Sequence, residues 1–130
     1  MLNAQMANVY KNQQVMTSSP AQLTLLLYNG ALRFLSECIL ATEQGNIEKA
    51  HHANQRVQAI VHEFVVTLDM SYEISKNWAR LYEYTEHCLI QGNIKRDVQQ
   101  LQQAKHVLQE LREAWVGAME QTHVARAVGK

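Results

Sequence analysis

Residues 19–45 read SPAQLTLLLYNGALRFLSECILATEQG. Serine is a favoured helix N-cap, proline suits the first helical position, and Gln22 stands where its side chain completes a capping box with Ser19. The stretch ends at Gly45, and glycine is common just after a helix C-terminus. The pattern therefore predicts a single helix that begins after Ser19 and ends at Gly45.

The predicted helix carries two apolar stripes rather than one. The first stripe follows helical spacing through Leu23, Leu27, Gly30, Phe34, Cys38 and Ala41. The second stripe runs through Leu25, Tyr28, Leu32, Leu35 and Ile39. Because one stripe is enough to join a helical bundle, the second predicts surplus apolar surface that needs its own explanation.

Three further segments show a helical spacing of apolar residues, over 46–69, 71–92 and 93–120. The tripeptide Gly-Asn-Ile occurs at Gly45 and again at Gly92, and we expect each to end one helix and cap the next. Such short links make neighbouring helices antiparallel. We therefore predict an all-α, antiparallel up-down four-helix bundle over 19–120, with a flexible N-terminal arm over 1–18 and a disordered tail over 121–130.

Composition narrows the function. Lysine plus arginine and aspartate plus glutamate both number 12, so the net charge is zero, which argues against nucleic-acid binding and against attachment to lipid by charge. Apolar runs such as Leu25–Tyr28 are far shorter than the roughly 20 residues of a membrane span, so no membrane insertion is expected. The N-terminus lacks a signal-peptide pattern, and the two cysteines are too few for a disulfide scaffold. A cytoplasmic protein is the simplest interpretation.

Helical bundles often hold catalytic or metal sites, and the chain carries only fragments of the corresponding motifs. A carboxylate-bridged di-metal bundle needs two Glu-x-x-His motifs, and the chain has one, from Glu48 to His51. His62-Glu63 begins like a zinc-protease helix, but Val66 stands where the second histidine is needed. We predict no enzyme, no metal and no cofactor; the alternative is a histidine phosphotransfer bundle, with His62 as its candidate, or a metal-binding bundle.

Surplus apolar surface on a bundle without catalytic groups is typical of a partner site. A segment that folds as it binds would suit such a surface. Tyr28 and Tyr82 each follow a leucine, and the pattern leaves open whether they seal the core or line a groove. A homodimer formed through the second stripe is the other possibility left open.

Several linked motifs resemble those of the FliS family of flagellar secretion chaperones. They are TSSPAQL at 17–23, LLYNGAL at 26–32, ISKNWARLYEY at 74–84 and LREAW at 111–115, with Tyr10 and Gln13 or Gln14 upstream. The resemblance covers about residues 6–116. Two departures stand out: Asn29 replaces a usual aspartate and Trp78 replaces a usual leucine.

The resemblance implies a cytosolic bundle without nucleotide or metal that binds the disordered C-terminal segment of flagellin. Such a chaperone prevents premature polymerisation and helps deliver flagellin to the flagellar type III export gate; an anti-sigma factor is a further candidate partner. Motif matches and second-stripe positions together give the candidate groove residues Tyr10, Gln14, Leu25, Tyr28, Leu32, Leu35, Ile39 and Tyr82. Which of them face the partner and which seal the bundle is left open, as is the identity of the flagellin.

Overall fold

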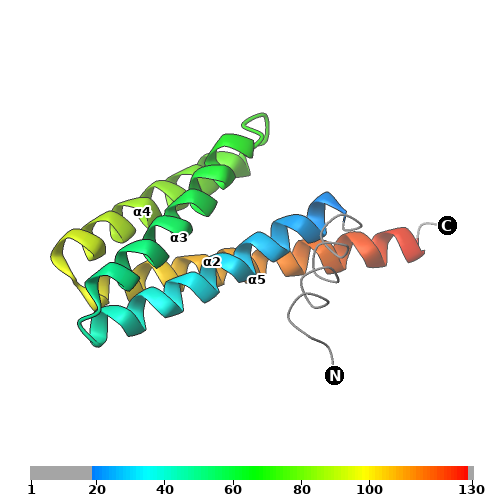
Figure 1. Ribbon diagram of the computed structural model, residues 1–130. Helices are drawn as coiled ribbons and strands as arrows, with labels where there is room; N and C mark the ends of the chain where they lie inside the picture. Colours follow the sequence, from blue (N-terminus) through cyan, green and yellow to red (C-terminus); the bar gives the residue numbers. More distant parts are fainter. Residues whose placement is uncertain (1–18, 129–130) are drawn as a thin grey trace, which may run out of the picture.

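The computed structural model describes residues 19–128, and the side chains of residues 19–121. These described residues form four helices: α2 (Pro20–Glu43), α3 (Ile47–Thr67), α4 (Ile74–Lys95) and α5 (Val98–Val128). They form the predicted antiparallel bundle, in which α2 packs on α3 and α5, and α4 packs on α3 and α5. Figure 1 shows that the α3–α4 hairpin crosses the α2–α5 pair and diverges from it towards the loop between α3 and α4.

The start of α2 is as predicted. The Ser19 hydroxyl accepts a hydrogen bond from the Gln22 backbone N–H at 3.2 Å, and the Gln22 side chain accepts one from the Ser19 N–H at 3.1 Å. The next turn is also as predicted, because Gly45 takes a φ of 75° and the Asn46 side chain caps α3 by accepting from the Lys49 N–H. These features are local, so the sequence alone specifies them.

The other ends differ from the prediction. Helix α4 begins at Ile74 rather than after Ser71, and it continues past Gly92 to Lys95, where Arg96 takes the left-handed conformation with a φ of 53°. Gly92 therefore lies inside α4 and does not mark the end of that helix. At the other end of α5, residues 121–128, which the sequence analysis assigns to the tail, continue the helix.

Gly92 has a packing role instead. It is buried, and a Cβ atom at this position would lie 2.6 Å from Leu101 Cδ2. Such a distance is a steric clash, so the missing side chain lets α4 and α5 approach closely just before the turn that joins them.

The core is mostly apolar, and Asn54 is the largest of its buried polar side chains other than the tyrosines. Asn54 is fully buried, and its Nδ2 donates to the Leu89 carbonyl oxygen at 3.1 Å and lies 3.7 Å from Cys38 Sγ, while its Oδ1 accepts from Gln58 at 2.6 Å. Because α2, α3 and α4 meet at this one side chain, it fixes their relative register. Cys38 and Cys88 are both free and buried, as their stripe positions predict.

Helix α2 is the most apolar of the described helices. By length and by a mean hydropathy of 1.3, it is the one described helix that could cross a membrane. Its buried side chains fill the bundle core, and several of its other leucines remain exposed, including Leu26, Leu27 and Leu40. The surplus apolar surface predicted for this helix is therefore present, although not on the stripe that was expected to carry it.

Candidate functional site

An apolar cleft opens where the two helix pairs diverge, at what we call the open end of the bundle. Its volume is about 650 Å³. The first turns of α2, the end of α3, the α3–α4 loop, the start of α4 and one stretch of α5 form its walls. The lining residues are Pro20, Leu23, Thr24, Leu27, Tyr28, Glu63, Phe64, Thr67, Leu68, Asp69, Tyr72, Ile74, Ser75, Trp78, Tyr82, Trp115 and Ala118.

Stacked aromatic rings form the floor of the cleft. Phe64 packs between Tyr28 and Tyr82, with ring centroids 4.4 and 5.5 Å away, and Trp78 meets Tyr82 edge-on. The two tyrosine hydroxyls share a hydrogen bond of 2.8 Å. Burial raises the pKa of both tyrosines above its usual value, so both hydroxyls stay neutral and the floor carries no charge.

Polar contacts hold α5 against α2 beside the cleft. The Trp115 indole Nε1 donates to the Ala21 carbonyl oxygen at 3.0 Å, which satisfies the indole while its ring lines the cleft. The Arg112 Nε donates to the Asn29 side-chain oxygen at 2.5 Å. The wall formed by α2 and α5 is therefore fixed by specific bonds as well as by packing.

The α3–α4 loop forms the rim of the cleft opposite the start of α2. Asp69 Oδ1 accepts hydrogen bonds from the Ser71 backbone N–H at 2.9 Å and from the Ser71 hydroxyl at 2.6 Å. These two bonds lower the pKa of the Asp69 carboxyl below its usual value, so the rim keeps a negative charge. The Ser75 hydroxyl donates to the Asp69 carbonyl oxygen and ties the loop to the first turn of α4.

Comparison with known proteins identifies the family. Residues 1–122 match the family described as "Flagellar protein FliS". The chain belongs to the FliS family. It is 32% identical over 111 residues to the "Flagellar secretion chaperone FliS" of Bacillus subtilis, covering 85% of this chain and 84% of that protein. It is 31% identical over 112 residues to the protein of the same name from Salmonella typhimurium, covering 84% and 83%.

The structure divides the candidate groove residues of this FliS-family chain into three groups. Tyr28, Leu35, Ile39 and Tyr82 are buried by the bundle's own helices, and only the two tyrosines of these line the cleft. Leu25 and Leu32 are half-buried on α2 and do not line it. Tyr10 and Gln14 lie outside the described residues.

Several cleft residues were not among the candidates. Leu23 and Leu27 belong to the first stripe, which we expected to seal the core, yet Leu27 is 36% exposed. Trp78 and Trp115 were noted only as part of family motifs, although both are wide aromatic side chains in the cleft wall. Their aromatic character was the available signal, because tryptophan is enriched where an apolar surface meets a partner.

The two departures from the family pattern lie on different helices, Asn29 on α2 and Trp78 on α4. Asn29 accepts the bond from Arg112, where an aspartate would add a charge pair. Trp78 enlarges the aromatic lining of the cleft. Neither departure removes a contact that holds the site together.

The residues considered for metal or phosphoryl chemistry are dispersed. Within residues 19–121, no three His, Cys, Asp or Glu side chains lie close enough to hold a metal ion. His51, from the single Glu-x-x-His motif, shares a hydrogen bond of 3.0 Å with the Asn93 side chain and so joins α3 to α4. His62 is exposed on α3.

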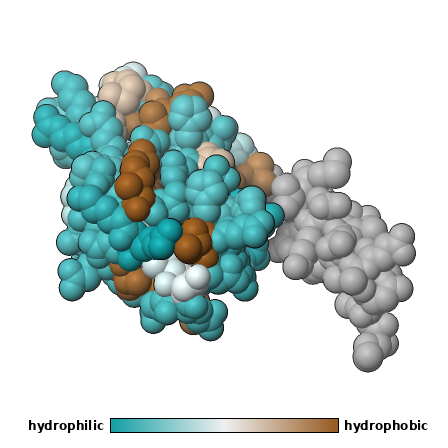
Figure 2. Space-filling view, turned by 60° about the vertical axis from the view of Figure 1, so that its left-hand side comes forward, coloured by the Kyte–Doolittle hydropathy of each residue, from teal (hydrophilic) through white to brown (hydrophobic). Residues whose placement is uncertain are grey.

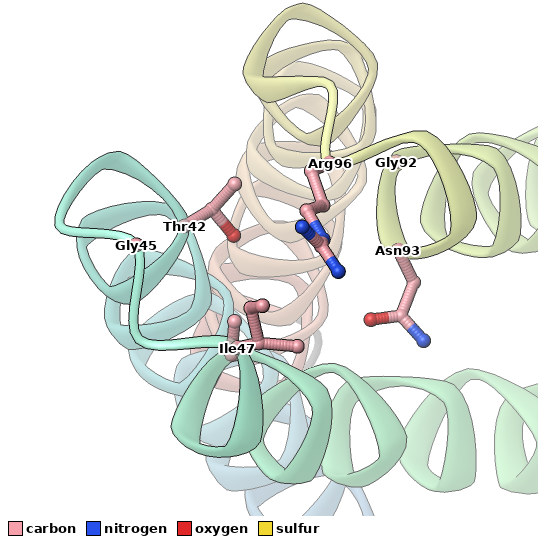
Figure 3. A pocket seen from close by; sticks show the side chains of 7 residues that line it. Thr42, Gly45, Ile47, Gly92, Asn93 and Arg96 are labelled. Carbon is pink, nitrogen blue, oxygen red and sulfur yellow. The ribbon is translucent and has the colours of Figure 1, made fainter.

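The opposite end, the closed end, contrasts with the cleft. Figure 3 shows the α2–α3 turn beside the α4–α5 turn, with Arg96 pointing into the gap between them. The cavity between the two turns is about 80 Å³, and a more open hollow of about 490 Å³ beside the start of α3 is lined mostly by polar and charged side chains, among them Glu37, Lys49 and Arg56. In Figure 2, which turns this side of the molecule forward, hydrophobic patches stand apart on a mostly hydrophilic face.

Proposed function

We propose that this chain is a cytosolic export chaperone that binds the C-terminal segment of flagellin, prevents its premature polymerisation and assists its delivery to the flagellar type III secretion apparatus. The observation that carries the proposal is the apolar cleft of about 650 Å³ in a chain whose relatives are named flagellar secretion chaperones. A bundle whose described residues form an apolar cleft can bind a partner without performing any chemical step, so we propose a binding protein rather than an enzyme.

The proposed mechanism is the burial of apolar surface. Flagellin's terminal segment would present an apolar face that otherwise associates with other flagellin molecules, and a chaperone that covers this face removes the drive for assembly. A partner that becomes ordered on binding loses several kcal/mol to that ordering, so we expect a contact above about 2,000 Å². The cleft would then be one anchor point within a longer contact.

The residues we propose for this anchor are apolar ones of the cleft wall that are exposed, such as Leu27, or half-buried, such as Trp78. Leu27 and Trp78 would contact the partner, while Tyr28 and Tyr82 would form the floor beneath it. Leu25 and Leu32 remain candidates for a longer contact along α2. Tyr10 and Gln14 remain proposals from the family motif.

Other partners follow from the same family role. Handover to the export machinery requires contact with the flagellar export gate, which we propose as the second partner. An anti-sigma factor and a second copy of this chain are competing proposals for exposed apolar surface.

Titration calorimetry with a synthetic peptide of the host flagellin's C-terminal segment tests the proposal. Leu27→Ala at the open end should weaken binding by about 1–3 kcal/mol, because it removes an exposed wall residue of the site. Leu40→Ala is the matched control, since Leu40 is a leucine of the same helix, 54% exposed, outside the cleft. It should leave affinity unchanged, and both variants should melt close to the parent protein.

Absence of binding by the parent chain would refute the proposed function. Equal losses for the two leucine variants would place the contact away from the cleft.

A further inference from the structure

The walls of the cleft are mostly apolar, and the charged side chains that line it are all negative. Of the residues that line it within the described chain, the charged ones are Glu63 and Asp69, and no lysine or arginine is among them. Both carboxylates lie on the side formed by the end of α3 and the loop that follows it. In a chain whose net charge is zero, this local excess of negative charge is a property of the site.

Asp69 is positioned to receive a cation. Its bonds to Ser71 both end on Oδ1, so among the described residues Oδ2 is left as an acceptor. The carboxyl is exposed and the loop that carries it is tied to α4 by the Ser75 hydroxyl. A cation at the rim would therefore meet a charge held in place.

The aromatic lining favours the same kind of group. Tyr72, Trp78 and Trp115 line the cleft, and a guanidinium or ammonium group is attracted to the face of an aromatic ring. This chain already uses that contact elsewhere, because the guanidinium carbons of Arg33 and Arg56 lie 5.0 and 5.2 Å from the centre of the Phe34 ring. The alkyl stem of a lysine or arginine would also cover apolar wall.

We infer that the flagellin segment that fills this cleft carries a lysine or arginine beside its apolar anchors, and that this cation binds at the rim that carries Glu63 and Asp69. The inference rests on the proposed function and adds to it a statement of which peptide segments the cleft prefers. Segments with an acidic residue at that position would be rejected, since a carboxylate would face two others at the rim.

The test uses the full chain, the flagellin C-terminal peptide and titration calorimetry at about 0.02 M and about 0.5 M salt, where surface charges are weakly and strongly screened. The rim variant is Glu63→Gln with Asp69→Asn; an asparagine keeps a side-chain oxygen for the two bonds from Ser71. The control variant is Glu43→Gln with Glu83→Gln, which removes the same charge from exposed positions outside the cleft.

At low salt the rim variant should bind about fivefold more weakly than the parent chain, the sum expected for two exposed charge pairs. At high salt the difference should nearly vanish. The control variant should match the parent at both salts. Changing the peptide's lysines and arginines to glutamine one at a time should identify one position at which the rim variant and the parent bind equally.

Other outcomes overturn the inference. If the rim variant binds like the parent while Leu27→Ala still weakens binding, the cation is refuted and the proposed function stands. If no substitution in the peptide removes the difference between the rim variant and the parent, but Lys11→Gln in the full chain removes it, the cation belongs to the chain's own N-terminal segment. If the parent chain does not bind the peptide, the proposed function itself fails.

Discussion

The two ends of the bundle are built from the same four helices and differ in how they close. At the closed end a buried glycine lets α4 approach α5, and the two turns leave a cavity of about 80 Å³. At the open end the helix pairs diverge around stacked aromatic rings and leave about 650 Å³. The two ends therefore differ in how closely their helices approach, and the open end is the one with room for an apolar partner.

The largest change in stability should come from adding a side chain at Gly92, where α4 and α5 approach closely. Gly92→Ala places a methyl group 2.6 Å from Leu101 Cδ2 and 2.8 Å from its Cγ, inside a core where Leu101 is fully buried. Overpacking of this kind costs about 1–3 kcal/mol, which should exceed the roughly 1 kcal/mol that alanine gains over glycine in a helix. We expect a net loss of unfolding free energy, measured by chemical denaturation.

Gly117→Ala is the control for that prediction. Gly117 lies inside α5, and a Cβ there meets no described atom within 4 Å. It should stabilise the chain by up to about 1 kcal/mol through helix propensity alone. If both substitutions stabilise the chain equally, the close approach at the closed end does not constrain the fold.

The contrast between the two Gly-Asn-Ile tripeptides shows what the sequence could predict. At Gly45 the turn depends on backbone conformation and on the Asn46 cap, which are local, and the prediction is confirmed. At Gly92 the same tripeptide lies within a helix, and the absence of a side chain there makes room for Leu101 instead of ending the helix. Local pattern cannot separate these cases, since the difference arises from a residue on another helix.

The same limit applies to the candidate site. Two apolar stripes on α2 predicted surplus surface, but helical spacing cannot say which stripe faces the neighbours. Tyr28, Leu35 and Ile39 of the second stripe are buried in the core. Leu27 of the first stripe is exposed. That choice depends on the angle at which the α3–α4 hairpin crosses α2, which is a property of the assembled bundle.

A smaller effect should follow at the α2–α5 contact beside the cleft. Asn29→Asp would turn the Arg112 hydrogen bond into an ion pair on an exposed surface, which is worth about 0.2–1 kcal/mol. Thermal melts at low salt should show a small gain that disappears at high salt. The gain should also be absent in an Arg112→Gln background; a gain that persists there would have another cause.

Hydrogen exchange of the backbone amides, with and without the flagellin peptide, tests most directly whether the open end receives the partner. Binding in the cleft predicts added protection over residues 20–28 and 67–82, with little change at the closed end over 40–47 and 90–97. Protection confined to the closed end, or an equal change at both ends, would contradict the assignment of the partner site to the cleft.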